Sequence, residues 1–394
     1  MPETSRRVAL LLNLAHALDH LFLLIFATAV AAIAADFGFA RWEDVMPYSV
    51  GAFAMFGLGS LPAGKLGDSW GRRPMMLVFF FGLGGSALLA AATQTVWQLA
   101  AALALLGAFA SIYHPVGIPM LVQGAKKPGA TIGVNGLSGN LGLAAAALLT
   151  GFLVQALGWR AAFALPGLVC ISLGFVFARL VPAEAEPPSR RSRPAAVALS
   201  PAQLARVLAV MTVASATASL LFNLTTNGNG RLLAERFAGV VSDPATLGGL
   251  LAGVYAVASL AQVVVGRLLD RVPLKRLQMT IVLAQAPLLA AASQAQGWWL
   301  YAALLGVMIL IFGAIPFTDA VIVRYVDDRM RSRVAGLRLT LSLGFSSLAV
   351  WALGPVVKAS GFGTLLMAMA GIALCTAAAL LALPAESGAR RAQG

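Results

Sequence analysis

The side chains best suited to chemistry in this sequence are ionisable groups that lie inside long apolar stretches. Four of them stand out: His16, Asp19, His20 and His114, which include every histidine of the chain. His16 and His20 share one helical face, and Asp19 lies beside it. If the two stretches are helices of opposite direction, His114 lies at the same depth as the other three, because each residue adds 1.5 Å along a helix. We therefore expect one polar cluster.

Three interpretations of this cluster are open. Imidazole and carboxylate groups exchange protons near neutral pH, and such groups relay protons inside membrane proteins. The same donors bind iron, zinc, copper or nickel, which would make His16, Asp19, His20 and His114 a metal site. In the third interpretation the cluster only joins two helices through satisfied hydrogen bonds.

A second polar set is spread over other apolar stretches. Asp319 and Arg338 are expected at similar depth, where they could form an ion pair that opens during function. Alternatively, Arg338 binds a carboxylate or phosphonate through its bidentate fork, or extends to the membrane interface. Four amides complete the candidate binding set: Asn13, Asn135, Asn223 and Asn227.

The segment 223–230 is rich in asparagine, threonine and glycine, which are poor helix formers. It is either a broken helix that contacts a ligand or simply the outer end of a helix. In both cases Asn223 and Asn227 share a face because they are four residues apart.

The composition identifies the environment of these groups. Only 11% of the residues are charged, against about 25% in a soluble domain, and 59% are hydrophobic. The mean hydropathy is +0.85. A soluble fold could not cover its surface with so few charges, so the chain is expected to lie in a lipid bilayer. The net charge of +13 then serves to orient the chain, and no nucleic-acid partner is expected.

Helices that span a bilayer need about 20 mostly apolar residues. The sequence contains twelve such segments, in two sets of six. We therefore expect an all-α membrane protein with an N-terminal six-helix bundle (1–181), a cytoplasmic linker (182–204) rich in proline and arginine, and a C-terminal six-helix bundle (205–394). The predicted spans are 8–34, 45–63, 74–94, 98–123, 130–156, 160–181, 205–229, 246–265, 277–295, 298–323, 334–356 and 362–383.

The distribution of basic residues indicates the orientation. With the N-terminus in the cytoplasm, most of the 28 lysines and arginines fall in inner segments, as the positive-inside rule requires. We therefore expect a bacterial-type inner membrane protein with both termini cytoplasmic. The basic residues of the outer segments are Arg41, Arg160, Arg231, Arg236 and Lys358.

Two related loops indicate an internal repeat. Gly64–Arg73 follows the second predicted span, and Gly266–Arg271 follows the eighth. Repeated bundles joined by a long loop are typical of transporters with a substrate site between the halves. The first loop resembles the loop 2–3 signature of the major facilitator superfamily, G-x-L-a-D-[RK]-x-G-[RK]-[RK], and departs from it at Ser69. The matching residues are Gly64, Leu66, Asp68, Gly71, Arg72 and Arg73, with Gly266 and Asp270 in the weaker second copy.

The resemblance implies that this loop is a cytoplasmic gate. The physical properties of its residues agree, since glycines permit a tight turn and close helix approach. Asp68 can face the positive end of a neighbouring helix or an arginine of the same loop. We expect Arg72 and Arg73 to lie in the anionic-lipid interface.

The resemblance also implies two pseudo-symmetric six-helix bundles, rocker-switch alternating access, and a central cavity lined by the first and fourth helices. Residues 13–20 and Ser111–Pro115 resemble, more weakly, the fosmidomycin-resistance-type and drug:proton antiporter branch, which exports drugs or small organic anions.

We therefore expect a proton-coupled secondary transporter of a small organic solute, with Asp19 and the three histidines coupling the proton. The alternatives are a transporter of a transition metal or metal chelate, and a proton-coupled importer of an organic anion. No G-x-x-x-x-G-K-[ST] motif is present, so the proton gradient rather than ATP is the expected energy source. We expect no cofactor and no enzymatic activity, and a monomer whose partners are its substrate and the bilayer.

Overall fold

The computed structural model of the protein describes residues 5–123, 125–190, 200–241, 243–327 and 329–383. Over these ranges the chain consists of helices and the turns that join them. Apolar segments form helices in a membrane because their backbone groups can find hydrogen-bond partners only within the segment. The middle of the predicted linker and both chain ends, 1–4, 191–199 and 384–394, lie outside the described residues.

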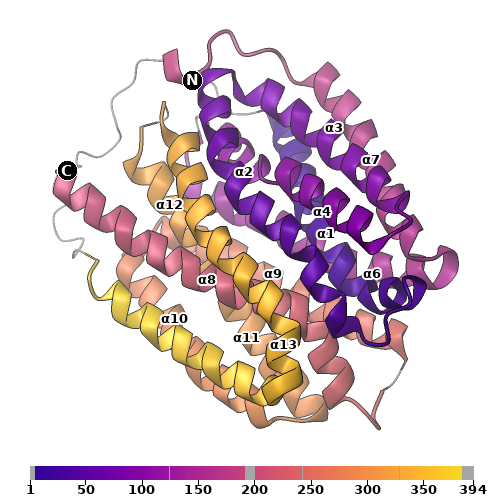
Figure 1. Cartoon of the computed structure of the whole chain (residues 1–394). Coiled ribbons are helices and arrows are strands. Elements are labelled where there is room, and N and C mark those ends of the chain that lie inside the picture. The colour runs from indigo at the N-terminus through magenta and orange to yellow at the C-terminus, as the bar shows by residue number, and fades with distance from the viewer. Residues whose placement is uncertain (1–4, 124, 191–199, 242, 328, 384–394) are drawn as a thin grey trace.

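The helices fall into an N-terminal half, α1 to α7, and a C-terminal half, α8 to α13 (Figure 1). The N-terminal elements are α1 (Arg6–Asp36), η1 (Trp42–Asp44), η2 (Met46–Ser49), α2 (Val50–Ser69), α3 (Arg72–Ala91), α4 (Val96–Ala110), η3 (Tyr113–Gly117), α5 (Ile118–Leu121), α6 (Pro128–Leu157) and α7 (Trp159–Leu180). The linker contains η4 (Pro188–Arg190). The C-terminal elements are α8 (Pro201–Arg236), α9 (Pro244–Leu269), α10 (Leu274–Gln294), α11 (Gly297–Ala314), α12 (Pro316–Tyr325) and α13 (Arg331–Leu380).

These helices account for the twelve predicted spans, and the predicted all-α fold is confirmed. Within the described residues, 10 helices are long and apolar enough to cross a membrane. One of them, α13, is two spans that meet at Gly361, whose φ of 74° glycine adopts without strain. The remaining span is α10, which has 21 residues and contains Gln278 and Gln285.

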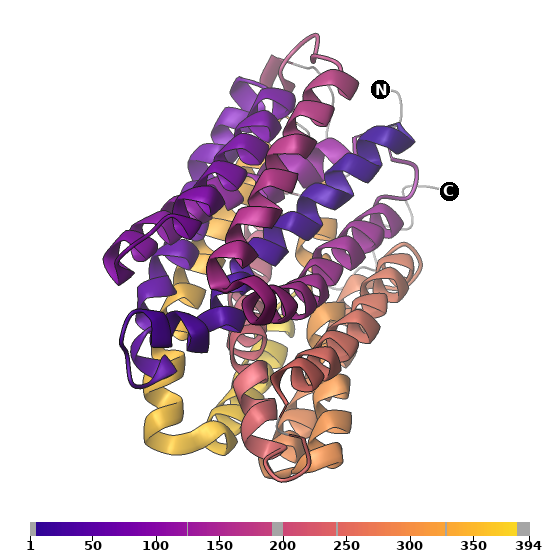
Figure 2. The same ribbon diagram turned by 90° about the vertical axis from the view of Figure 1, so that its right-hand side faces the viewer.

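Two long helix pairs join the halves. Helix α2 packs along the first part of α13, and α6 packs along α9. In the rotated view the amber helix α13 reaches up beside the N-terminal half (Figure 2). Small residues permit this approach, because a β-carbon at Gly64 would collide with the backbone of Ser332, and one at Gly133 would lie 2.6 Å from the carbonyl oxygen of Gln262.

Of the two interpretations of residues 223–230, the structure supports the outer part of a helix, because these residues belong to α8 and do not form a broken segment. The helix continues without interruption to Arg236. Its polar side chains bond to carbonyl groups one turn earlier, as the amide of Asn227 does to the carbonyl oxygen of Asn223 at 2.9 Å. Side-chain groups that are satisfied in this way do not have to compete for the backbone, so the helix persists.

The start of α8 also lies earlier than the predicted residue 205. The side chain of Ser200 accepts a hydrogen bond from the N–H of Gln203, and the side chain of Gln203 bonds back to the N–H of Ser200. This reciprocal capping box stabilises the first turn of the helix. The linker is correspondingly shorter than the predicted 182–204.

Candidate functional site

A cavity lies between the two halves, bordered by α1, α2, η3 and α6 on one side and by α8 and α10 to α13 on the other. Its volume is about 120 Å³, and side chains of both halves line it. Much of the wall is apolar, with the rings of Phe53, Phe56 and Phe222. The ionisable side chains that line it are His20, His114, Asp319 and Arg338.

The N-terminal half contributes the four-membered cluster that the sequence places at one depth. The imidazole ring of His16 lies 4.8 Å from that of His20 and 4.9 Å from that of His114, measured between centroids. Nε2 of His114 lies 3.6 Å from Oδ2 of Asp19, whose side chain is completely buried. His20 and His114 line the cavity, whereas His16 and Asp19 lie behind them.

His114 reaches this position through an irregular turn of the fourth span. After α4 the helix widens into the π-helical turn η3, which contains Pro115, a residue with no N–H for the regular helical ladder. A β-carbon at Gly117 would lie 2.7 Å from the ring of Tyr113, so this glycine makes room for the tyrosine. The Tyr113 ring then stacks on His16 at a centroid distance of 4.7 Å.

A hydrogen-bond network holds His16. Its Nδ1 donates to the backbone carbonyl of Asn135 at 2.8 Å, which leaves Nε2 buried and without a partner. The side-chain amide of Asn135 donates to Oδ1 of Asn13 at 2.8 Å and to the hydroxyl of Tyr113 at 2.7 Å. Neither asparagine is part of the cavity lining. The structure therefore places Asn13 and Asn135, predicted to bind substrate, in positions where they support the cluster.

The three imidazoles meet one requirement of a metal site, because their ligand nitrogens lie within 4.8 Å of one another. Two nitrogens bound to one tetrahedral zinc ion lie only ~3.3 Å apart, given Zn–N distances near 2.0 Å. The rings would therefore have to move together to hold an ion. Transfer of a proton between His114 and Asp19 requires much less movement, since 3.6 Å is close to hydrogen-bond distance.

The C-terminal half contributes an ion pair. Nη2 of Arg338 on α13 donates a hydrogen bond of 2.9 Å to Oδ1 of Asp319 on α12, as the predicted ion pair requires. The exposed fractions are 8% for Arg338 and 9% for Asp319. Nε of Arg338 is buried and has no hydrogen-bond partner. The pair therefore leaves one donor of the guanidinium unused.

Four amides line the cavity. Asn223 and Asn227 do so from one face of α8, and their N–H groups bond to the carbonyls of Ser219 and Asn223 at 2.8 and 2.9 Å. Gln278 and Gln285 on α10 also line it and were not predicted. Their seven-residue spacing places both on one helical face of an apolar span, and this spacing is the signal that could have identified them.

Carboxylates of the two loops join the halves at one end of the cavity, here called the Asp68 end. Oδ2 of Asp68 accepts a hydrogen bond of 2.9 Å from the N–H of Arg333 at the start of α13. Asp270 accepts bonds of 3.2 and 3.0 Å from the N–H groups of Gly129 and Ala130 at the start of α6. Each carboxylate therefore caps the positive end of a helix in the other half.

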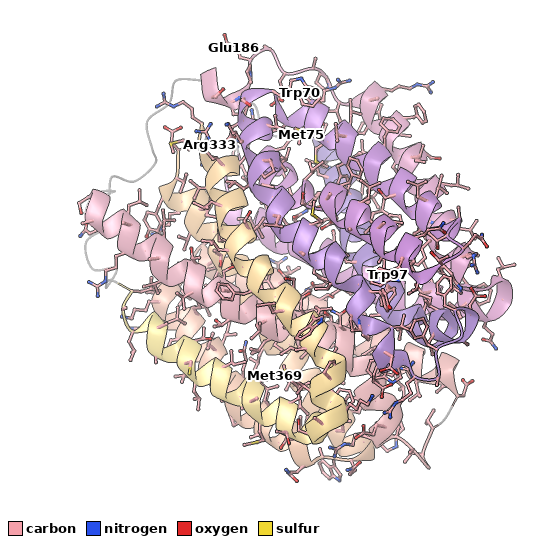
Figure 3. All side chains as sticks on the ribbon, viewed as in Figure 1. Trp70, Met75, Trp97, Glu186, Arg333 and Met369 are labelled. Atoms are coloured by element: carbon pink, nitrogen blue, oxygen red, sulfur yellow. The ribbon has the colours of Figure 1, made fainter. Side chains whose placement is uncertain are left out.

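The turn between α2 and α3 depends on Gly71, whose φ of 124° strains any other residue. Figure 3 shows Trp70, beside this glycine, at the same end of the bundle as Arg333 and Glu186. In the second copy of the loop, Gly266 allows close approach, since a β-carbon there would lie 2.7 Å from the backbone of Gly133. The glycines of the repeated loops therefore serve turning and packing.

Arg72 and Arg73 do not lie at the lipid interface that was predicted for them. Arg72 is completely buried, donates to the carbonyl of Pro119 at 3.1 Å and lies 3.9 Å from Asp68. Arg73 donates to two carbonyls at the end of α7, at 2.7 and 2.8 Å. Glu184 of the linker accepts bonds from the backbone N–H groups of both arginines. Protein groups supply the partners that lipid phosphates were expected to supply.

The halves also touch at the opposite end, here called the Asp44 end. Nζ of Lys358 on α13 lies 3.7 Å from Oδ1 of Asp44. The guanidinium of Arg231 on α8 lies over the ring of Trp42, 5.0 Å from its centroid. The halves therefore touch at both ends of the cavity.

Comparison with known proteins identifies the family. The model of the Major Facilitator Superfamily matches residues 12–241, more than half of the chain, whereas no curated protein matches the sequence. The human organic anion transporter MFSD10 (TETRAN) is 15% identical with a TM-score of 0.74, over 95% of this chain and 99% of that one. The proton:xylose symporter XylE, bound to 6-bromo-6-deoxy-D-glucose, is 14% identical with a TM-score of 0.74, over 96% of this chain and 95% of that one. The chain is therefore a multi-pass membrane protein that belongs to the major facilitator superfamily.

Proposed function

We propose that the protein is a proton-coupled secondary transporter that moves a small organic solute by rocker-switch alternating access. The observation that carries the proposal is the cavity between the halves, which has titratable side chains on one side and a buried ion pair on the other. Breaking the contacts of the Asp68 end and those of the Asp44 end in turn would open the cavity to one side of the membrane at a time.

The pair of His114 and Asp19 is the proposed proton carrier. With 3.6 Å between Nε2 and Oδ2, a small approach lets a proton pass from one to the other. Neither oxygen of Asp19 accepts a hydrogen bond, so no other donor competes for them. His20 and His114 line the cavity and connect the buried carboxylate to it. The remaining titratable or charged groups around this pair are His16, Tyr113, Asp319 and Arg338.

We place the Asp68 end in the cytoplasm of a bacterial-type inner membrane. The helix ends on this side carry Lys65, Arg267, Lys275 and Arg276, and the positive-inside rule assigns such basic ends and the short loops between them to the cytoplasm. Both termini are then cytoplasmic, and the proton gradient across the membrane supplies the energy.

Reconstitution into liposomes tests this function. A pH-sensitive dye inside the vesicles reports proton flux when a panel of neutral, anionic and zwitterionic solutes is added under an imposed pH gradient. We expect at least one solute to move protons with the wild-type protein, and Asp19→Asn to abolish this flux because an amide does not carry a proton. Asp36→Asn, at the end of α1 outside the cavity lining, is the matched control and should keep the flux.

Two results would contradict the proposal. Solute movement without any proton movement in the wild-type protein would remove proton coupling. Undiminished flux in Asp19→Asn, with the same dependence on pH, would remove Asp19 from the coupling pathway.

A further inference from the structure

We infer that the substrate is a small organic anion, which binds by replacing Asp319 as the partner of Arg338. The inference rests on the proposed transport function and specifies its substrate class. Among the described residues that line the cavity, Arg338 is the only lysine or arginine. A planar guanidinium matches the geometry of a carboxylate or phosphonate, so Arg338 can bind the acidic group of a substrate.

The hydrogen bonds of Arg338 show that Asp319 does not use all the donors of the guanidinium. Asp319 receives a single bond, 2.9 Å long, from Nη2. Nε of the same guanidinium is buried without a partner. A free carboxylate can lie alongside the fork and bond two nitrogens at once, which is the stronger arrangement. Asp319 is fixed on α12 and does not make this contact, so an acidic solute can compete with it for the guanidinium.

Charge balance explains how such a solute would draw a proton into the cavity. Arg338 and Asp319 neutralise each other, so an added anion makes the net charge of the cavity and its wall more negative by one. An uncompensated charge away from water is costly. One proton bound in the facing cluster, on His114 or Asp19, offsets the added charge. The anion and the proton therefore stabilise each other, and the pair crosses the membrane in the same direction.

Arg338 and the cluster that contains His114 are close enough for the anion and the proton to stabilise each other. Turn η3, which carries His114, packs against α13, which carries Arg338. His114 and the positively charged guanidinium of Arg338 line the same cavity. An anion on Arg338 would screen that charge, and the groups that would share the incoming proton are His16, His20, Asp19 and His114.

The other side chains that line the cavity indicate how polar the rest of the substrate is. Phe53, Phe56 and Phe222 offer aromatic surface, and Gln278 and Gln285 offer amide groups. Rings stack on or meet the edges of such aromatic side chains. The best match is a compact acid with an apolar or aromatic body and few further polar groups.

Matched ligand pairs test the inference. The probes are benzoate, salicylate and phenylphosphonate, with benzamide, salicylamide and benzyl alcohol as neutral counterparts. Binding to purified protein is measured by thermal shift and calorimetry between pH 5.5 and 8. We expect an anion to bind at least tenfold more tightly than its neutral counterpart, to bind more tightly at lower pH, and to bring about one proton with it.

The double variant Arg338→Gln/Asp319→Asn replaces both charges by amides and so leaves no buried charge unpaired. It should lose at least tenfold in affinity for the anion and keep its affinity for the neutral counterpart. Arg160→Gln, which removes an arginine paired with Asp36 at the Asp44 end, is the control and should bind the anion normally. Absence of binding by every anion, or equal losses for both members of a pair, would overturn the inference.

This experiment separates the inference from the function on which it rests. Proton-coupled transport of neutral solutes alone would overturn the anion site and leave the proton-coupled transporter standing. Tight anion binding at Arg338 with no proton uptake at any pH would keep the anion site and overturn the proton coupling.

Discussion

The cavity is bordered by two sets of ionisable side chains, one from each half, and their hydrogen bonding differs. In the N-terminal half, three imidazoles and Asp19 lie close together, but Asp19 accepts no hydrogen bond and Nε2 of His16 has no partner. In the C-terminal half, Asp319 and Arg338 form a short, buried ion pair. Hydrogen-bonding atoms without a partner are free to gain and lose a proton. A closely matched ion pair instead stabilises both of its charges. In the proposed mechanism the first group changes its charge, whereas the second changes its partner.

The largest effect should follow from breaking the fixed pair. Arg338→Gln leaves Asp319 buried without its counter-charge, which is expected to lower the free energy of unfolding by about 3–5 kcal/mol. The double variant with Asp319→Asn should recover most of this loss. Unfolding in detergent, followed by the thermal midpoint, measures both. A single variant as stable as the wild type would show that the pair is not a coupled unit.

A smaller effect is expected from the support of the cluster. Asn135→Ala removes the amide that donates to Asn13 and Tyr113, at an expected loss of about 1–3 kcal/mol. Asn140→Ala on the same helix is the matched control, because its buried amide nitrogen has no partner and should contribute less. Both are measured as shifts of the thermal midpoint. Equal losses would mean that side-chain volume on α6, rather than the network, determines stability.

The contacts of Asp68 and Asp270 allow a second comparison of the halves, with the smallest expected difference. Asp68 is completely buried beside Arg72, whereas Asp270 is exposed, although both cap a helix of the opposite half. Asp270→Asn keeps a capping side chain, so we expect about 1 kcal/mol or less. Asp68→Asn should cost more because it also removes the charge beside a buried guanidinium. The accessibility of a cysteine introduced at Thr340 would report how far each variant opens the Asp68 end; equal opening in both would contradict the ranking.

The features that the sequence predicts well follow from hydropathy and helical rise. Twelve spans follow from the length of the apolar segments, and the cluster follows from counting residues inward along two antiparallel helices. The pairing of Asp319 with Arg338 follows from the same count. Each of these features depends on the position of a residue along the membrane normal. That position can be counted within a single apolar segment, without knowing which helices pack together.

The features that it misses depend on which distant group a side chain meets. The sequence predicts Arg72 at the lipid interface because it does not show that the carbonyl of Pro119 accepts a hydrogen bond from this side chain. The sequence likewise does not show that Asn13 and Tyr113 accept hydrogen bonds from the side-chain amide of Asn135. The persistence of α8 through residue 230 has a related cause, since propensity alone does not account for side chains that bond back to their own helix.

The irregular turn η3 has a consequence for motion. A π-helical turn contains one residue more than the α-helical turn that it replaces, and it interrupts the fourth span at Tyr113–Gly117. If the turn tightened into regular α-helix, the side chains on one side of it would swing about the helix axis by about 100°, the angle of one residue. His114 lies within this turn, so its imidazole would rotate relative to Asp19 and shift by about 1.5 Å along the helix axis. A one-residue slip of register in this helix would therefore be one way to disconnect the buried carboxylate from the cavity.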